Sequence, residues 1–288
     1  MLVGLLLFVR LERISQNDVE VLMDIGVFDS GLGGLLVTQS LIQRLPDYSY
    51  VYLGDTARVP YGNRSQETIY QFTVQAVDYL FRSGCALVIL ACNTASAEAL
   101  RRIQREYLPK YYPDRRVLGV LIPAAEEAIQ VTKNNQIGVL GTVSTVASGA
   151  FVREIKKLNP DAEVYQQAAP LLVPLLENQG MKWINPIIDE YLASLLAQNI
   201  DTLILGCTHY PLVKTVFRGK VGPAIRVICQ DEIIPVKLGK YLTRHPETEQ
   251  RLARTSQRRF FVTDITSTSN SLANQLFGQQ TALKKIEL

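Results

Sequence analysis

Two cysteines of this 288-residue chain follow apolar runs in the same local context. Cys92 comes directly after the run 86–91, and Cys207 after the run 202–206, and in both cases small polar residues then open a helical pattern. Such runs are typical of buried parallel strands. We therefore expect each thiol at the carboxyl end of a strand, where open α/β sheets bind ligands, and near a helix N-terminus that favours the thiolate. One such cysteine is more often a core residue, but two in matching contexts favour a function.

A pair of opposed thiols suits the exchange of a proton at a carbon stereocentre. Inversion needs a base on one face of the carbon and an acid on the other, and cysteine, with an unperturbed pKa of about 8.5, can take either role. With each sulfur about 3–3.5 Å from the carbon, the two sulfurs would lie roughly 6–7 Å apart, too far for a disulfide without closure.

Metal and redox chemistry are less well supported by the residues. The chain has two histidines, His209 and His245, so a thiol–imidazole zinc site would lack ligands. It contains no Cys-x-x-Cys of the thioredoxin type. We therefore expect no metal site.

An internal repeat places the two cysteines in equivalent positions. Three short matches occur in the same order at nearly equal spacing: 25–28 with 137–140, 59–60 with 173–174, and 89–92 with 204–207. This repeat predicts an α/β fold of two pseudo-symmetric parallel-sheet domains with the active site in the cleft between them. Both cysteines would then point into one cleft from opposite sides.

The apolar patterns predict the elements that form these domains. Strands are expected at 24–28, 50–53, 86–91, 117–122, 137–141, 164–167, 202–206, 225–229 and 260–263. Helices are expected at 35–45, 65–82, 93–107, 124–132, 146–158, 186–198 and 268–277, with a proline-containing loop at 169–180. We expect an N-terminal extension at 1–23, a first domain formed by 24–115 plus 230–288, and a second domain at 116–229.

Composition excludes several classes of partner. Hydrophobic residues make up 47% of the chain and charged residues 20%, as in ordinary globular proteins, and a net charge of +3 is too weak to indicate nucleic-acid binding. The basic cluster at 251–259 is interpreted as a solvated helix face beside a strand.

The apolar run 2–9 is too short to span a bilayer, and Met23 is a candidate translation start. The four cysteines do not resemble a disulfide framework and fit a reducing cytoplasm.

Four motifs resemble those of glutamate racemases. They are Asp-Ser-Gly-Leu-Gly-Gly at 29–34, Gly-Asp-Thr-Ala-Arg-Val-Pro-Tyr-Gly at 54–62, Ala-Cys-Asn-Thr-Ala-Ser at 91–96 and Gly-Cys-Thr-His-Tyr-Pro at 206–211. The resemblance runs from about Asp24 to the C-terminus. It implies cofactor-independent interconversion of L- and D-glutamate, which supplies D-glutamate for bacterial peptidoglycan. It also implies a two-domain α/β enzyme that forms a homodimer.

The resemblance assigns roles to individual residues. Cys92 and Cys207 would be the two acid/bases, with Asp29 beside one thiol and His209 or Glu177 beside the other. Substrate contacts are expected from Asp29, Ser30, Tyr61, Gly62, Asn93, Thr94, Thr142, Thr208 and His209. Asp29 would take the substrate ammonium, while hydroxyls and helix-start N–H groups would hold the carboxylates. Thr142 occupies the repeat position of Ser30, as either a ligand or a helix cap.

Residues outside these motifs have structural interpretations. Cys85 and Cys229 are expected in the core. Trp183 and the tyrosines at 107, 111 and 112 are expected in packing or at an interface.

Two alternative functions remain open from the sequence. An aspartate or other amino-acid racemase of the same superfamily would share the paired cysteines, although His209 favours glutamate because the aspartate enzymes tend to carry Glu there. A non-catalytic protein that binds a dicarboxylate in the cleft would not need either thiol.

Overall fold

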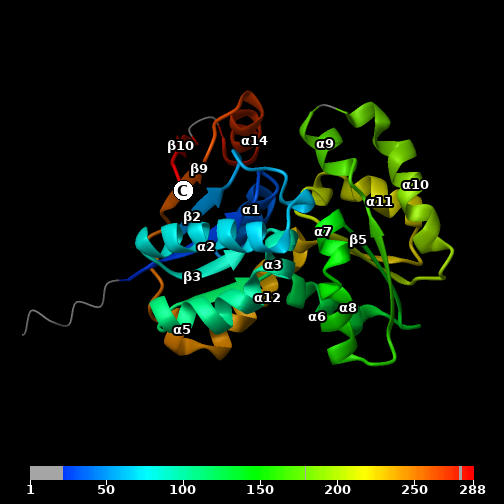
Figure 1. Ribbon diagram of the computed structural model, residues 1–288, viewed down its shortest axis with the longest axis horizontal. Coiled ribbons are helices and arrows are strands. Elements are labelled where there is room, and N and C mark those ends of the chain that lie inside the picture. Colours follow the sequence, from blue (N-terminus) through cyan, green and yellow to red (C-terminus); the bar gives the residue numbers. More distant parts are fainter. Residues whose placement is uncertain (1–21, 179, 279–280) are drawn as a thin grey trace, which may run out of the picture.

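Two parallel sheets, one in each lobe of the molecule, carry helices on both faces (Figure 1). The structure is a computed structural model and describes residues 22–178, 180–278 and 281–288. The first lobe is built on a six-stranded sheet of order β10-β9-β2-β1-β3-β4, and the second on a four-stranded sheet of order β6-β5-β7-β8. Every pairing between these strands is parallel, as expected of an α/β fold with two parallel sheets.

The elements have the following bounds. The strands are β1 (Asp24–Asp29), β2 (Tyr50–Gly54), β3 (Cys85–Leu90), β4 (Arg116–Gly119), β5 (Gln136–Gly141), β6 (Glu163–Ala168), β7 (Thr202–Gly206), β8 (Arg226–Ile228), β9 (Arg258–Val262) and β10 (Leu283–Lys285). The α-helices are α1 (Gly34–Arg44), α2 (Gln66–Arg82), α3 (Asn93–Glu98), α4 (Leu100–Arg102), α5 (Leu108–Tyr111), α6 (Leu121–Val131), α7 (Val143–Ala147), α8 (Ala150–Leu158), α9 (Leu172–Glu177), α10 (Ile184–Leu196), α11 (Lys214–Val221), α12 (Gln230–Arg244), α13 (Pro246–Glu249) and α14 (Ser267–Phe277). Short 3-10 turns lie at Tyr61–Asn63, Met181–Trp183 and Tyr210–Val213, and a π-helical turn at Ile103–Tyr107.

The sequence repeat corresponds to a repeated strand order. In the first sheet β1 lies between β2 and β3, and in the second sheet β5 lies between β6 and β7. The orders β2-β1-β3-β4 and β6-β5-β7-β8 are therefore the same arrangement in both lobes. In the first lobe the order of the strands reverses between β1 and β3, and in the second lobe between β5 and β7. Doubly wound sheets bind ligands at such a reversal.

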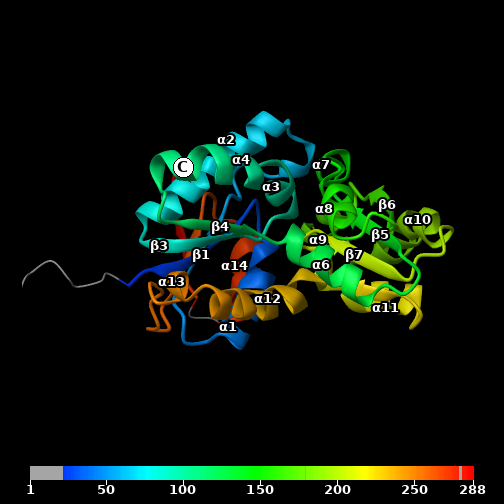
Figure 2. The same ribbon diagram turned by 90° about the horizontal axis from the view of Figure 1, so that it is seen from below.

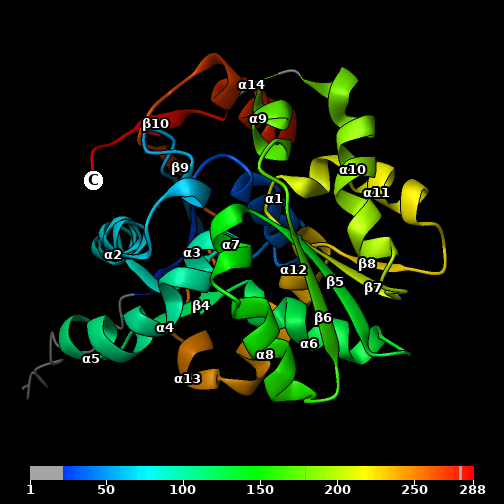
Figure 3. The same cartoon turned by 45° about the vertical axis from the view of Figure 1, so that its right-hand side comes forward.

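Both faces of each sheet are covered by helices, so the side chains on both faces of the strands are apolar. The strands therefore appear in the sequence as continuous hydrophobic runs. In the first lobe, Ile25 and Val27 pack with Leu35 of α1 and Leu238 of α12 on one face, and Phe28 packs with residues of α2 on the other. Figure 2 shows α1 and α12 below this sheet and α2, α3 and α4 above it. The second sheet lies between α10 and α11 on one side and α6 and α8 on the other (Figure 3).

Two predicted boundaries are wrong. The strand expected at 117–122 ends at Gly119, and α6 begins at Leu121. The helix expected at 146–158 is divided into α7 and α8 at Gly149, whose φ of 61° lies in the left-handed region. A left-handed residue interrupts the helical hydrogen bonding, and glycine is the residue that adopts this conformation most easily.

Three further segments differ from the prediction. The expected loop 169–180 contains α9, and the basic residues at 251–259 do not form a helix face, because Arg258 and Arg259 belong to β9. The helix α12 was not expected, since Pro235 within it is a residue that normally interrupts a helix. This helix packs against α1 and α6 and brings the chain back to the first lobe.

The sheets also differ from the expected division of the chain at residues 115/116. The strand β4 pairs with β3 and so extends the first sheet to Gly119. Most of the expected extension 1–23 lies outside the described residues, but Met23 forms a parallel bridge with Leu252. None of the helices in the described part of the chain has both the length and the apolar character needed to cross a bilayer.

Candidate active site

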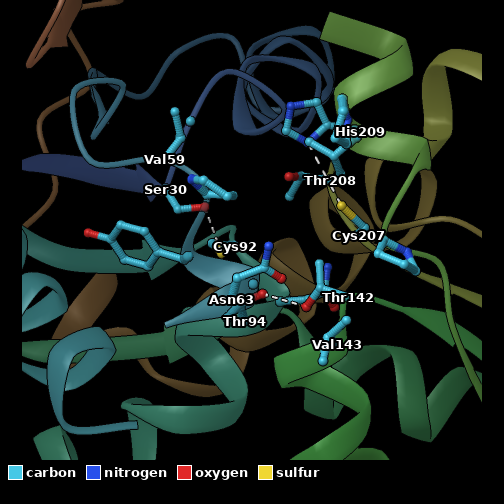
Figure 4. Close-up of a pocket in the computed structure, with 18 of the residues that line it drawn as sticks. Ser30, Val59, Asn63, Cys92, Thr94, Thr142, Val143, Cys207, Thr208 and His209 are labelled. Carbon is cyan, nitrogen blue, oxygen red and sulfur yellow. Dashed lines mark hydrogen bonds between the residues drawn. The ribbon is translucent and has the colours of Figure 1, made fainter. Parts of the chain in front are cut away.

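One cavity of about 180 Å³ lies at the carboxyl ends of the central strands of both sheets. The first lobe contributes residues that follow β1 and β3, and the second lobe contributes residues that follow β5 and β7. The lining residues are Ser30, Gly31, Val59, Pro60, Tyr61, Gly62, Asn63, Cys92, Asn93, Thr94, Thr142, Val143, Ala169, Pro170, Val173, Pro174, Glu177, Asn178, Gly206, Cys207, Thr208 and His209. Figure 4 shows Ser30 and Cys92 on one side of this cavity and Cys207, Thr208 and His209 on the other.

Cys92 is the N-cap residue of α3, so its thiol is fixed by the start of the helix. Its Sγ accepts a hydrogen bond from the backbone N–H of Ala95 at 3.4 Å and lies 3.2 Å from the Ser30 hydroxyl. Burial and the nearby Asp29 raise the pKa of Cys92 to about 12, although these two hydrogen bonds oppose the change. The helix start thus favours the Cys92 thiolate through the Ala95 N–H, as expected, but burial has the larger effect and the pKa is raised.

Cys207 belongs to a chain of polar groups in the second lobe. Its Sγ lies 3.8 Å from Nδ1 of His209, whose Nε2 lies 2.8 Å from Oε1 of Glu177 at the end of α9. Burial lowers the pKa of His209, but the contacts with Cys207 and Glu177 raise it, and the net result is well above the usual value. The contacts with Cys207 and Glu177 therefore favour the protonated form of His209.

Asp29 lies next to the cavity but is not among its lining residues. It is completely buried. Its oxygens accept hydrogen bonds from the Gly31 N–H at 2.9 Å and the Thr208 hydroxyl at 3.2 Å. Asp29 thus supports the wall of the cavity from behind and connects the first lobe to the residue that follows Cys207.

Tyr61 and Gly62 line the cavity in different ways. The Tyr61 hydroxyl donates to the buried carboxylate of Asp55 at 2.5 Å, so this hydroxyl is engaged outside the cavity. A Cβ on Gly62 would lie 2.9 Å from the Cβ of Thr142. Glycine at this position therefore allows the loop of the first lobe to meet the second lobe closely.

Hydroxyl groups join the two lobes at the floor of the cavity. The Thr94 hydroxyl lies 3.0 Å from that of Thr142 (Figure 4). It also lies 3.3 Å from the hydroxyl of Thr145. Thr142 also accepts a hydrogen bond from the Thr145 N–H and so caps α7. The two alternatives for Thr142 are thus compatible, because the same side chain caps the helix and faces the cavity.

The electrostatic character of the cavity is set by few charges. Among the described lining residues none is lysine or arginine, and Glu177 is the one carboxylate. No group of three or more histidine, cysteine, aspartate or glutamate side chains comes together within the described ranges in a way that could hold a metal. The cavity therefore offers an acidic ligand neutral donors and the His209 ring, whose raised pKa favours its protonated form.

Several residues of the site were not expected. Val59, Asn63, Val143 and Asn178 line the cavity. Asn63 and Val143 adjoin predicted site residues and could have been found from that proximity. Asn178 could not, because its position depends on α9, which the sequence did not predict.

The other two cysteines and the aromatic residues lie elsewhere. Cys85 and Cys229 are buried in hydrophobic clusters, as expected of core residues. Trp183 is 56% exposed and so does not pack in the interior. In the tyrosine cluster, Tyr107 and Tyr112 both donate their hydroxyls to the carboxylate of Asp78.

The sequence is similar to those of one known family of enzymes. The family described as Asp/Glu/Hydantoin racemase matches residues 25–230. The glutamate racemase of Persephonella marina is 40% identical over 269 residues, which cover 92% of this chain and 98% of that protein. The glutamate racemase of a Sulfurihydrogenibium species is 41% identical over 272 residues, with the same shares of both chains.

Solved structures show the same relationship in three dimensions. A glutamate racemase from Bacillus anthracis has a TM-score of 0.84 at 34% identity, covering 92% of this chain and 98% of the other. A glutamate racemase from Francisella tularensis, solved in complex with D-glutamate, has a TM-score of 0.80 at 31% identity, covering 93% and 98%. The chain therefore belongs to the Asp/Glu/Hydantoin racemase family and is an amino-acid racemase.

Proposed function

We propose that this protein interconverts L- and D-glutamate without a cofactor, with Cys92 and Cys207 as the two acid/bases. The observation that carries the proposal is the position of the thiols, which come from equivalent strands of two similar lobes and line one cavity. Two relatives that are named glutamate racemases match this chain over nearly their whole length. The product D-glutamate would serve peptidoglycan synthesis, and the four free cysteines fit the reducing cytoplasm.

The two thiols have different partners, and this difference assigns their roles in one direction of the reaction. With a pKa of about 12, raised chiefly by burial, Cys92 is protonated at neutral pH and can donate a proton. Cys207 lies 3.8 Å from Nδ1 of His209, a ring nitrogen that can orient its sulfur, and we assign it the role of the base. Cys207 would then remove the Cα proton on one face while Cys92 supplies a proton to the other. In the reverse direction the roles exchange, so the first proton transfer also prepares the site for the return reaction.

The intermediate would carry negative charge on Cα and the α-carboxylate. Because the Cα proton is very weakly acidic, this charge needs donors that are in place before the reaction. The Thr94 hydroxyl and the backbone N–H groups at the starts of α3 and α7 are such donors. The hydrogen bond between Thr94 and Thr142 joins the two lobes at this point, so little reorganisation accompanies the proton transfer.

Incubation of the purified protein with L-glutamate, without pyridoxal phosphate, is expected to yield D-glutamate that chiral chromatography can measure. L-Aspartate is one methylene shorter and would leave part of the cavity unfilled, so its kcat/KM should be lower by about 10- to 200-fold. Turnover of aspartate equal to or faster than that of glutamate would contradict the proposed substrate. Binding of glutamate without any turnover would instead indicate a dicarboxylate-binding protein.

A further inference from the structure

We infer that Gln230 is a positioning residue, which turns the amide of Asn93 so that its NH2 group is offered to a carboxylate of the substrate. This inference rests on the proposed function and names one element of its substrate recognition. Asn93 directly follows Cys92 and lines the cavity, whereas Gln230 is the first residue of α12 and does not line it.

The contact between the two amides carries the inference. Nε2 of Gln230 donates a hydrogen bond of 2.9 Å to Oδ1 of Asn93, and both side chains are at least 98% buried, with exposures of 0% and 2%. Nδ2 of Asn93 has no hydrogen-bond partner in the described part of the protein. An unpaired buried donor is unfavourable, so a ligand acceptor that reaches it gains a favourable hydrogen bond.

The orientation of the Asn93 amide is not fixed by its own helix. Oε1 of Gln230 is also without a partner in the described part, so turning over both amides together would preserve one hydrogen bond. The turned arrangement would present Oδ1 of Asn93 to the ligand, and this oxygen would repel a carboxylate. A bound carboxylate therefore selects the arrangement in which Gln230 is the donor.

The first turn of α12 holds Gln230 in place. Asp231 forms an ion pair of 2.6 Å with Lys214, and Glu232 forms one of 2.7 Å with Arg218, both across to α11 of the second lobe. Ion pairs at adjacent positions limit rotation and displacement of this helix start. Gln230 is consequently attached to both lobes at the point where it meets Asn93.

A similar arrangement, in which a buried side chain orients a polar residue of the cavity, occurs beside Cys207. The residue that follows Cys207 is Thr208, and its hydroxyl donates to the buried Asp29, which belongs to the other lobe and does not line the cavity. Each polar residue that follows a cysteine is thus oriented by a buried side chain from a distant part of the chain. The likeness of the two arrangements supports an orienting role for Gln230.

The variant Gln230→Met, which keeps the length of the side chain, tests this role. Loss of the donor should raise KM for glutamate by about 10-fold, as one hydrogen bond to a charged group would require, with kcat close to that of the wild type. The Kd for D-glutamate from calorimetry should rise by the same factor. Gln230→Glu replaces the donating NH2 group by a carboxylate, which can only accept a hydrogen bond. It should therefore turn the NH2 group of Asn93 away from the ligand, and KM should rise further. The matched control is Gln104→Met, which removes a glutamine hydrogen bond to the Val117 carbonyl outside the cavity and should leave both constants unchanged.

A double substitution separates orientation from a general structural effect. If Gln230 acts through Asn93, then Gln230→Met should add less than about twofold to the KM of an Asn93→Ala variant, because the orienting target is already absent. Additive effects in the double variant, or an unchanged KM and Kd in Gln230→Met, would overturn the inference. Absence of racemisation in the wild type would instead contradict the proposed function, so the two failures are distinguishable.

Discussion

Replacement of Cys92 or Cys207 by serine is expected to lower kcat/KM for racemisation by about 10²- to 10⁴-fold in both directions, the range that a positioned acid or base contributes. A hydroxyl has nearly the same reach as a thiol, so the substrate should still bind. It holds its proton much more tightly, however, and cannot exchange one with Cα. Formation of each enantiomer, followed by chiral chromatography, measures the loss.

The chain provides a matched control for these variants. Cys85 is buried in the core of the first lobe and does not line the cavity, so Cys85→Ala should retain nearly full activity. Calorimetric binding of D-glutamate to the serine variants would show that the cavity is intact. Near-wild-type racemisation by Cys207→Ser would remove that thiol from the mechanism.

The substitution Gly33→Ala is expected to lower kcat/KM by about 10²-fold, since small displacements of catalytic groups have effects of this size. A Cβ at this position would lie 2.4 Å from the Thr208 hydroxyl oxygen, 2.8 Å from the Thr208 carbonyl carbon and 2.8 Å from Nδ1 of His209. These atoms must move, and with them the partner of Cys207. Steady-state kinetics together with thermal unfolding would show a loss of activity larger than the loss of stability.

The control for this prediction is Gly219→Ala. A Cβ on Gly219, within α11, has no atom within 4 Å among the described residues, so the change should leave kcat/KM unaffected. It should also stabilise the protein by about 1 kcal/mol through helix propensity. Equal activity of the two alanine variants would contradict the close packing of Gly33 against His209.

The sequence predicted the two sheets because their strands are buried on both faces and therefore form continuous apolar runs. The repeat of these runs also predicted that Cys92 and Cys207 would occupy equivalent positions, and both line one cavity. Local patterns were sufficient here, because a strand and the helix start that follows it lie next to each other in the chain.

Contacts between distant segments were harder to predict. The helix α12 contains Pro235, and proline normally interrupts a helix. Neither this helix nor the position of Gln230 at its start was therefore expected. The resemblance implied a substrate contact for Asp29, but it did not predict that this carboxylate accepts hydrogen bonds from Gly31 and from Thr208 of the other lobe. Composition and periodicity do not specify such tertiary contacts. The raised pKa of Cys92 was missed for the same reason, since burial depends on how the lobes meet.

The claim that two thiols act on opposite faces of Cα is tested most directly by racemisation of L-glutamate in D₂O, stopped at low conversion. Mass spectrometry of the separated enantiomers should find deuterium at Cα of the D-glutamate formed, while the remaining L-glutamate keeps its hydrogen. Equal early labelling of both enantiomers, or D-glutamate that retains the original hydrogen, would indicate a single base and contradict the account.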